Sequence, residues 1–246
     1  MNQFTRTEQL LGPEALIKIK KAKVAVFGLG AVGSFAIEAL ARTGIGSFVL
    51  IDFDKIDLSN INRQIYALHS TIGKKKAMLA KKRIKDINPD CIVEIHDSFA
   101  NAESIETLLS KDVDVVIDAI DGLNSKVNLI CEAKKHGLKI VSSMGAAGKT
   151  DASMIRISDL FETNICPLAR FVRRRLRRRG VSKNIKCVYS MEEPKNNAQE
   201  PVLELELESN SEPDHGRKRP PLGTVPYVTG IFGLMIANIV IDEILN

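Results

Sequence analysis

Three glycines are spaced as in a turn that binds phosphate. Gly28, Gly30 and Gly33 form the pattern GxGxxG directly after an apolar run at residues 23–27. Glycine permits a tight turn and lets backbone N–H groups approach a phosphate at the positive end of a helix. The pattern therefore predicts a nucleotide site with contacts at these glycines and at Ala31, although tight packing of a strand against a helix gives the same spacing.

A carboxylate follows at a distance that suits a ribose. Asp52 stands 19 residues after Gly33, at the end of a second apolar run at residues 48–52. In dinucleotide-binding proteins a carboxylate at this position accepts hydrogen bonds from ribose hydroxyls. A plain loop carboxylate is the alternative. These features fit a nicotinamide dehydrogenase as well as any other nucleotide-binding protein.

Three charged residues further along favour a triphosphate. Arg63 and Lys76 can neutralise the charge that develops on departing pyrophosphate, and Asp121, after a predicted strand, can hold Mg²⁺. Each has an ordinary alternative, because Lys76 stands among five lysines between positions 74 and 82 and Asp121 could cap a helix. Their occurrence together and in this order makes the prediction specific.

One segment in the second half of the chain is strongly basic. Residues 163–191 hold nine Arg or Lys and no acid, while the whole chain is +5, so the rest is net acidic at −4 (5 minus 9). Such a segment indicates a phosphate-rich partner such as RNA, with a solvated helix paired to the acidic residues 192–214 as the alternative. The arginines expected to contact RNA are Arg170, Arg173, Arg174, Arg175, Arg177 and Arg178.

The cysteines predict neither a zinc site nor a disulfide framework. Cys91, Cys131, Cys166 and Cys187 are far apart in the chain and form no close pair. This usage fits a reducing compartment and predicts a cytoplasmic protein. Cys187 could serve as a reactive thiol, but a small buried side chain is the favoured interpretation.

Strands and helices alternate along the first half of the chain. Further strands are expected at residues 92–95, 113–118 and 138–142, and helices at 74–87 and 127–136. This order predicts an α/β fold, a doubly wound, mainly parallel sheet with helices on both faces and ligands beyond the carboxyl ends of its strands.

After residue 144 the pattern changes. Additional strands are expected at residues 154–157 and 186–190, a helix at 166–179 and a mobile or crossover segment at 192–222. The final apolar run, 225–245, is predicted to be a core helix rather than a membrane span. With 44% hydrophobic residues, 26% charged residues and a mean hydropathy of −0.03, a disordered chain or a protein with several membrane spans is excluded.

Four motifs together resemble a known family. In chain order they are GxGxxG, then LIDxDxxxxSNxNRQ at residues 50–64, GxxKA at 73–77 and DAxD at 118–121. This order is similar to that of the ThiF/MoeB/HesA family of ubiquitin-activating-like adenylyltransferases, over about residues 6–145. The resemblance implies that residues 1–150 form an ATP-binding adenylation core and that 151–246 complete the same domain.

The resemblance also implies a role for individual residues. Asp52 would hold the ribose of ATP, Asp121 would place Mg²⁺, and Arg6 would reach the partner subunit's site, which implies a homodimer. The matching positions expected to contact ATP, several of them on its phosphates, are Asp54, Ser59, Asn60, Arg63, Gln64 and Lys76.

Within the family, the chain most resembles the tRNA threonylcarbamoyladenosine dehydratases. The zinc-binding CxxC pairs of the sulfur-carrier activators are missing, and residues 39–46 and 187–190 match the dehydratases. That resemblance implies activation of the threonyl carboxylate on a modified tRNA, followed by attack of the carbamoyl group and release of AMP. Two departures are Gln3, where those proteins often have Arg, and the lack of a cysteine at residues 219–223.

Two other functions remain open at this point. The chain could adenylate the C-terminal glycine of a ubiquitin-like sulfur-carrier protein, or it could be a non-catalytic subunit that binds nucleotide or RNA. A sulfur-transfer or carrier protein could also be an accessory partner. No stable insertion into a membrane is expected.

Overall fold

A seven-stranded sheet organises the part of the chain that the structure describes. The computed structural model describes residues 2–195 and 223–246. The strand order is β3-β2-β1-β4-β5-β7-β6, and every pair is parallel except β6 with β7. The strands are β1 (Lys23–Phe27), β2 (Ser47–Ile51), β3 (Ile92–His96), β4 (Val115–Asp118), β5 (Lys139–Ser143), β6 (Ile155–Asp159) and β7 (Lys186–Ser190).

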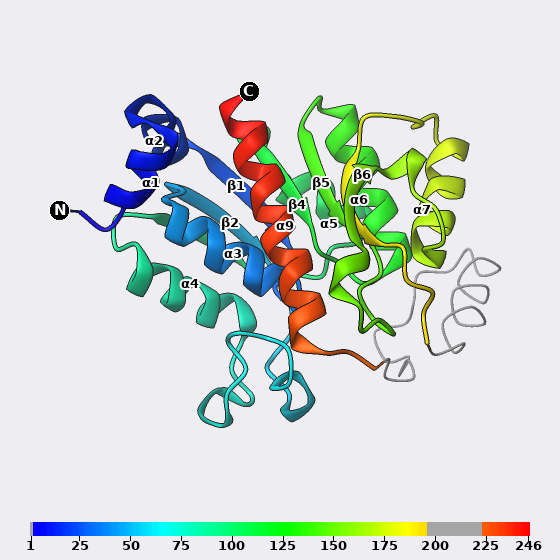
Figure 1. The fold of residues 1–246 in the computed structure, drawn as a ribbon, viewed down its shortest axis with the longest axis horizontal. Coiled ribbons are helices and arrows are strands. Elements are labelled where there is room, and N and C mark those ends of the chain that lie inside the picture. The colour runs from blue at the N-terminus through cyan, green and yellow to red at the C-terminus, as the bar shows by residue number, and fades with distance from the viewer. Residues whose placement is uncertain (1, 196–222) are drawn as a thin grey trace.

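Helices cover both faces of this sheet, as Figure 1 shows. α3, α4 and α9 lie on one face, and α5, α6 and α7 on the other. The helices are α1 (Thr5–Leu11), α2 (Pro13–Lys21), α3 (Gly33–Thr43), α4 (Lys76–Ile87), α5 (Ala102–Leu108), α6 (Leu123–Lys135), α7 (Pro167–Arg178) and α9 (Pro226–Leu245). The predicted doubly wound α/β fold is thus confirmed.

The core has two halves because strand side chains alternate between faces. In β1, Val24 and Val26 belong to the half under α3, whereas Ala25 and Phe27 belong to the half under α6. A strand buried on both faces reads as a continuous apolar run, which is why residues 23–27 and 48–52 were recognisable from sequence.

The chain order of the strands reverses next to β1. From β1 the chain passes to β2 and β3 on one side and then returns to β4 on the other, where Phe27 pairs with Asp118. In open α/β sheets, ligands bind at the carboxyl ends of strands beside such a reversal. The loop after β2, drawn in cyan in Figure 1, projects beyond this edge.

The last helix packs into the core against α3. Two glycines allow the close approach, because a Cβ on Gly233 would lie 2.5 Å from the Val32 carbonyl oxygen and one on Gly230 would lie 3.2 Å from the Phe35 ring. By length and composition α9 is able to cross a membrane, but half of its most apolar window is buried within the protein. Its buried residues include Val228, Phe232 and Ile236.

Several boundaries differ from the sequence-based prediction. α1, α2 and α5 were not predicted, and α6 begins at Leu123 rather than at residue 127. The strand predicted at residues 113–118 begins at Val115. Most of the predicted segment at residues 192–222 lies outside the described residues.

Candidate active site

The glycine turn between β1 and α3 is built for close backbone approach. Gly28 has a φ of +91°, and a Cβ there would lie 2.5 Å from the Ala119 carbonyl oxygen. A Cβ on Gly33 would lie 2.0 Å from the Gly28 carbonyl oxygen. Gly30 is different, because its nearest neighbour would be the Gln64 Nε2 at 3.7 Å. Gly28 and Gly33 are therefore required by the fold, whereas Gly30 keeps space open in front of the turn.

Asp52 follows β2 directly and is hydrogen-bonded to the glycine turn. Its Oδ2 accepts a hydrogen bond from the Leu29 N–H at 2.7 Å, and its Oδ1 accepts one from the Asp54 N–H at 2.8 Å. Burial raises the pKa of the Asp52 carboxyl, and the nearby Lys76 ammonium partly opposes that rise. Each carboxylate oxygen has a second lone pair, so the geometry leaves acceptors for ribose hydroxyls.

Lys76, the first residue of α4, lies at the same edge. Its Nζ is 2.6 Å from the Asp54 Oδ2, and its backbone N–H donates to the Asp54 carbonyl oxygen at 3.0 Å. The Lys76 side chain is almost fully buried, with 7% exposed. Since it also acts electrostatically on Asp52, one ammonium group faces both carboxylates at the end of β2.

The loop after β2 is a rigid, hydrogen-bonded turn. Asp57 and Asn60 cap each other across the short 3₁₀ helix Leu58–Asn60. The Arg63 guanidinium donates to the Ser59 carbonyl oxygen at 2.7 Å and to the Asn62 Oδ1 at 2.8 Å. This turn holds Asn60 buried and Arg63 half-buried.

Gln64 carries the clearest sign that a ligand belongs here. Its side chain is buried, and its Oε1 has no hydrogen-bond partner in the described structure. A buried amide oxygen without a partner is costly and calls for an explanation. Because the Gln64 amide lies beside Gly30, a bound nucleotide at the glycine turn fits this residue.

Asp121 lies in the loop between β4 and α6. It is exposed, and none of the described residues forms an ion pair or hydrogen bond with its carboxylate. The alternative role as a helix cap is wrong, since the N-cap of α6 is Gly122 and no side chain caps this helix. No cluster of three or more His, Cys, Asp or Glu with metal-binding geometry occurs in residues 2–195 and 223–246.

Arg6 lies near the end of α3 that is opposite the glycine turn. It is exposed on α1, two residues after Phe4, whose ring lies 3.3 Å from the position of a Cβ on Gly44. Gly44 follows the last residue of α3, and the 11 residues of α3 span ~16 Å. Arg6 is therefore not brought to the glycine turn of its own chain.

The arginines of α7 divide into two groups. Arg173 donates to Thr163 and Arg175 to Asn124, and Arg179 donates to the Asn128 Oδ1 at 2.6 Å. Burial and the neighbouring Arg177 lower the pKa of Arg173. The arginines of α7 that are exposed are Arg170, Arg174, Arg177 and Arg178.

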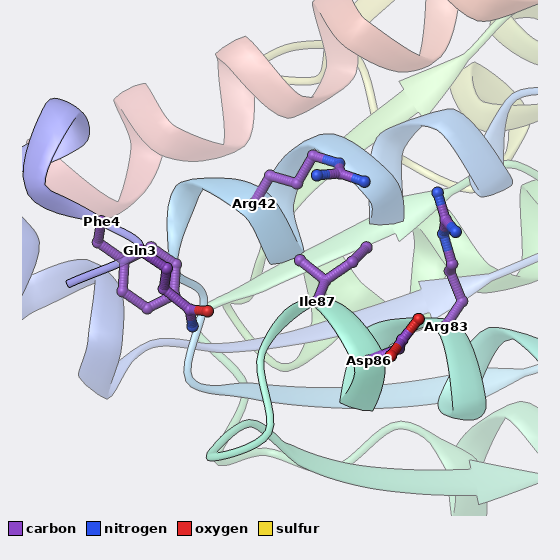
Figure 2. Close-up of a pocket in the computed structure, with 6 residues that line it drawn as sticks. All are labelled: Gln3, Phe4, Arg42, Arg83, Asp86 and Ile87. Carbon is purple, nitrogen blue, oxygen red and sulfur yellow. The ribbon is translucent and has the colours of Figure 1, made fainter.

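A separate cavity of about 410 Å³ lies at the opposite end of α3 from the glycine turn (Figure 2). Arg42 and Arg83, which line it, both pair with Glu38 at 2.7 and 2.8 Å. These two hydrogen-bonded arginines outweigh the effect of burial and keep the pKa of Glu38 below its ordinary value. With its arginines already paired, this cavity does not offer a free cationic site for a triphosphate.

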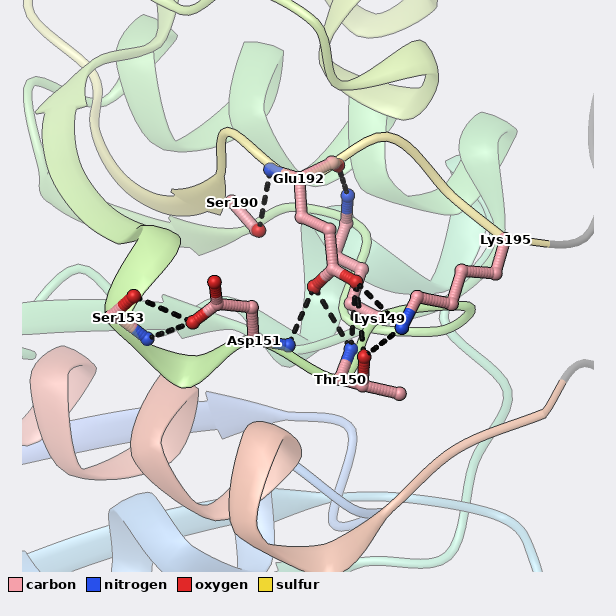
Figure 3. Close-up of polar contacts among 7 residues, drawn as sticks. All are labelled: Lys149, Thr150, Asp151, Ser153, Ser190, Glu192 and Lys195. Carbon is pink, nitrogen blue, oxygen red and sulfur yellow. Dashed lines mark hydrogen bonds and ion pairs between the residues drawn. The ribbon is translucent and has the colours of Figure 1, made fainter.

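A polar network closes the carboxyl end of β5 and β7 (Figure 3). The Glu192 carboxylate accepts hydrogen bonds from the Thr150 and Asp151 N–H groups at 2.9 and 2.7 Å, and the buried Lys149 donates to the Glu192 carbonyl. Burial lowers the pKa of Lys149. Sequence reasoning missed this network because lysines and glutamates usually indicate a solvated surface.

Gly148 connects both flanks of residues 196–222. Its carbonyl oxygen accepts a hydrogen bond from the Lys195 N–H, and its N–H donates to the Gly223 carbonyl oxygen, both at 2.8 Å. Gly148 has a φ of +71° and is buried. The chain therefore leaves and re-enters the described structure at one residue of the β5–β6 loop.

Cys187 has the surroundings of an inert core residue. It is fully buried in β7, and burial raises the pKa of its thiol well above the ordinary range.

Comparison with known proteins gives the family. The model of the ThiF family matches residues 4–246 of the chain. The chain belongs to the ThiF family. The family motifs inferred from the sequence include the glycine turn, Asp52 and Lys76.

Several similar proteins bear the same enzyme name. The tRNA threonylcarbamoyladenosine dehydratase of Bacillus subtilis is 38% identical over 246 residues, which is 100% of this chain and 96% of the relative. The Haemophilus influenzae protein of the same name is 37% identical over 99% of this chain and 94% of the relative.

Solved structures of an enzyme with this name are also similar to the chain. The Escherichia coli dehydratase TcdA in complex with ATP is 34% identical and superposes with a TM-score of 0.86, covering 99% of this chain and 93% of TcdA. Its complex with AMP gives a TM-score of 0.85 over 99% of this chain and 94% of that chain.

Proposed function

We propose that this ThiF-family chain is an ATP-dependent tRNA threonylcarbamoyladenosine dehydratase. The relatives that carry this name align over nearly their whole length as well as that of this chain. Within the chain, the buried Gln64 side chain is the observation that carries the proposal, because its amide nitrogen lies beside Gly30 and its amide oxygen has no partner among the described residues, which supports a polar ligand at the glycine turn.

The proposed first step is adenylation of a carboxylate. An oxygen of the threonyl carboxylate on the modified tRNA attacks the α-phosphorus of ATP, the bond from the α-phosphorus to the bridging oxygen breaks, and pyrophosphate leaves. No side chain needs to act as a nucleophile, so orientation and neutralisation of charge carry the catalysis. In the second step the carbamoyl group attacks the activated carbonyl carbon, a proton is released and AMP leaves. The product lacks one water.

The geometry suggests how the chain's residues divide this work. The N–H groups of the glycine turn face the phosphates, Asp52 accepts from the ribose, and Lys76 neutralises charge on the departing pyrophosphate. Arg63 would have to exchange its two contacts with the loop, to Ser59 and Asn62, for contacts with phosphate. Asn60, Ser59 and Gln64 complete the proposed ATP contacts.

Asp121 fits a role toward Mg²⁺ carried by ATP. Mg²⁺ in phosphate-transfer sites usually takes one or two carboxylates, substrate phosphates and water. Asp121 is an exposed carboxylate without an internal partner, and Ala119, two residues before it, packs against Gly28. The ion would neutralise charge on the phosphates, and Asp121 would set where it lies.

The exposed arginines of α7 are the proposed contacts to tRNA. Phosphate contacts from such a helix supply affinity without sequence specificity. Arg170 and Arg174 each lie over the Phe171 ring, at 5.0 and 5.4 Å from its centroid. The other exposed members are Arg177 and Arg178, and the half-buried Arg173 and Arg175 complete the proposed set.

We further propose a cytoplasmic homodimer in which Arg6 completes the partner subunit's site. This arrangement is supported by the position of Arg6 at the far end of α3 from its own glycine turn. A sulfur-transfer or carrier protein remains a proposed accessory partner.

Nucleoside analysis tests the function directly. The protein is incubated with ATP, Mg²⁺ and tRNA that carries threonylcarbamoyladenosine, and the digested nucleosides are measured by mass spectrometry. Loss of one water from the modified nucleoside, with formation of AMP and pyrophosphate, is the expected result. AMP formation with a ubiquitin-like carrier protein, and none with the tRNA, would instead establish the sulfur-carrier reaction.

A further inference from the structure

A fully buried ion pair lies beside the candidate site. The Lys126 Nζ is 2.7 Å from the Asp118 Oδ2, and the side chains of both residues are 0% exposed. Lys126 also donates to the Ser143 carbonyl oxygen at 2.9 Å, and the Ser142 hydroxyl donates to the same Asp118 oxygen. The group thus joins the end of β4, the end of β5 and the second turn of α6.

Such a pair is a poor source of stability. Removing two charges from water costs several kcal/mol per ion, and a matched apolar pair often stabilises a fold as well or better. What a buried, fully hydrogen-bonded pair supplies is a fixed geometry of the segments that it joins.

The structure shows which segment the pair holds. The other carboxylate oxygen of Asp118, Oδ1, accepts a hydrogen bond from the Ile120 N–H at 3.2 Å. The preceding Ala119 N–H donates to the Phe27 carbonyl oxygen at 2.9 Å. The start of the segment 119–122 is therefore hydrogen-bonded to β1 and to Asp118 of the ion pair. Asp121 is the third residue of this segment.

This segment forms one wall of the glycine turn. The Ala119 carbonyl oxygen would lie 2.5 Å from a Cβ on Gly28, so the two backbones are in contact. The Asp121 side chain forms no hydrogen bond or ion pair within the described residues, so the backbone of this loop sets its position. A shift of the loop would move both the wall and the Asp121 carboxylate.

We propose that Lys126 and Asp118 are positioning residues that hold residues 119–122 for adenylation. This role rests on the proposed reaction with ATP. Lys126 also cancels the negative charge of Asp118, which would otherwise lie unpaired near the triphosphate. Neither residue touches the substrate.

The test compares Lys126→Met with the matched variant Lys135→Met on the same helix, whose lysine is exposed and pairs with Glu132. Three quantities are measured for each: the dissociation constant for ATP by calorimetry, the single-turnover rate of AMP formation per folded molecule, and the thermal midpoint. Because a displacement of about 1 Å can cost about 100-fold in rate, we expect Lys126→Met to lower the rate by about 10- to 100-fold. The dissociation constant for ATP should change much less, and Lys135→Met should leave both quantities unchanged.

Two further variants separate positioning from folding. Lys126→Arg keeps the cation and should restore most of the rate. If Lys126→Met unfolds, the variant Asp118→Leu with Lys126→Met removes both charges and should fold, yet it should remain slow because the Ile120 N–H has lost its acceptor. A wild-type rate per folded molecule in that double variant would overturn the inference.

Hydrogen exchange keeps this inference distinct from the proposed function. The Ile120 amide should exchange faster in the folded Asp118→Leu, Lys126→Met variant than in the wild type, whichever substrate the protein acts on. Wild-type inactivity toward modified tRNA would count against the proposed function alone. Unchanged exchange at Ile120 would count against the positioning role.

Discussion

The ammonium group of Lys76 lies 2.6 Å from the Asp54 carboxylate, and the two partners differ in exposure, with 7% of the lysine side chain and 45% of the aspartate side chain accessible. The lysine is therefore fixed by its buried stem, while the carboxylate opposite it faces water. An anionic ligand that binds at this edge competes with a solvated carboxylate, rather than a buried one, for the Lys76 ammonium. This favours exchange of the ion pair with Asp54 for one between Lys76 and phosphate.

The first prediction concerns Lys76 and Asp121. Lys76→Ala and Asp121→Ala should each lower turnover by about 100-fold or more, because charge on the transition state loses its neutralisation. The thermal midpoint should change little, since Asp54 and Asp121 both reach water. Steady-state AMP formation and a melting curve measure the two effects, with Lys82→Ala as the control on the exposed side of α4. Near-normal turnover in either site variant would show that its residue lacks the proposed role.

The second prediction separates two glycines of the same turn. Gly30→Ala should fold normally, because its Cβ meets nothing closer than 3.7 Å, yet it should weaken ATP binding where phosphate approaches the backbone. Gly28→Ala should destabilise the protein by about 1–3 kcal/mol because of its positive φ and a clash with Ala119. Calorimetric titration with ATP and denaturant unfolding distinguish the two. Equal effects of both variants on ATP binding at equal stability would contradict this division.

The third prediction concerns the basic helix. Changing Arg174, Arg177 and Arg178 together to Gln should weaken tRNA binding and reduce its dependence on salt, because fewer phosphate contacts release fewer counterions. The matched control changes Lys20, Lys21 and Lys111, which are exposed outside α7 and carry the same total charge. Affinities measured over a range of salt concentrations decide the matter. If both triple variants show the same salt slope, α7 is not the tRNA-binding surface.

The fourth prediction tests the partner's arginine. Arg6→Ala and Lys76→Ala homodimers should each be nearly inactive, whereas mixed dimers contain one site with both residues intact. Mixing the two proteins, after dissociation and reassociation, should restore up to about one quarter of the wild-type activity, the statistical share of intact sites. A mixture no more active than its components would argue that Arg6 acts in its own chain or not at all.

The fifth prediction is a pH dependence at Glu192. Burial alone would raise its pKa, but hydrogen bonds from Asp151 and Thr150 outweigh burial and hold it below the ordinary value. A depressed folded pKa contributes stability that is present above the unfolded value, about 4.5, and is lost as pH falls through the folded pKa. Glu192→Gln should thus lower the thermal midpoint by about 2–4 °C at pH 7, with the difference vanishing toward pH 3. A difference that grows on acidification would contradict this sign.

Much of the fold was predictable because its strands carry unbroken apolar runs. β1 and β2 are buried on both faces, and α9 is a mostly apolar helix of 20 residues. α5 escaped prediction because Ile105 is its one buried residue, so its sequence shows no helical period. The start of α6 was placed too late because two of its buried residues, Ser125 and Lys126, are polar and conceal its apolar face.

The residues of the candidate site were predictable from the sequence, but the buried residues that hold them in place were not. The glycines, Asp52 and Lys76 follow known spacings, and the structure brings Gln64 to Gly30 and Ala119 to Gly28. The buried Lys126 and Lys149 carry no recognisable signal in the sequence, because only the folded chain reveals the carboxylate or carbonyl that each one meets. The positions of Arg6 and the α7 arginines toward a partner stay predictions.

The two hydrogen bonds of Gly148 hold both flanks of residues 196–222. Its carbonyl oxygen accepts from the Lys195 N–H, and its N–H donates to the Gly223 carbonyl oxygen. The points where the chain departs after β7 and returns before α9 are therefore set by one residue of the β5–β6 loop. A substitution that disturbs the positive φ of Gly148 would shift the end of the β7 segment and the approach to α9 together.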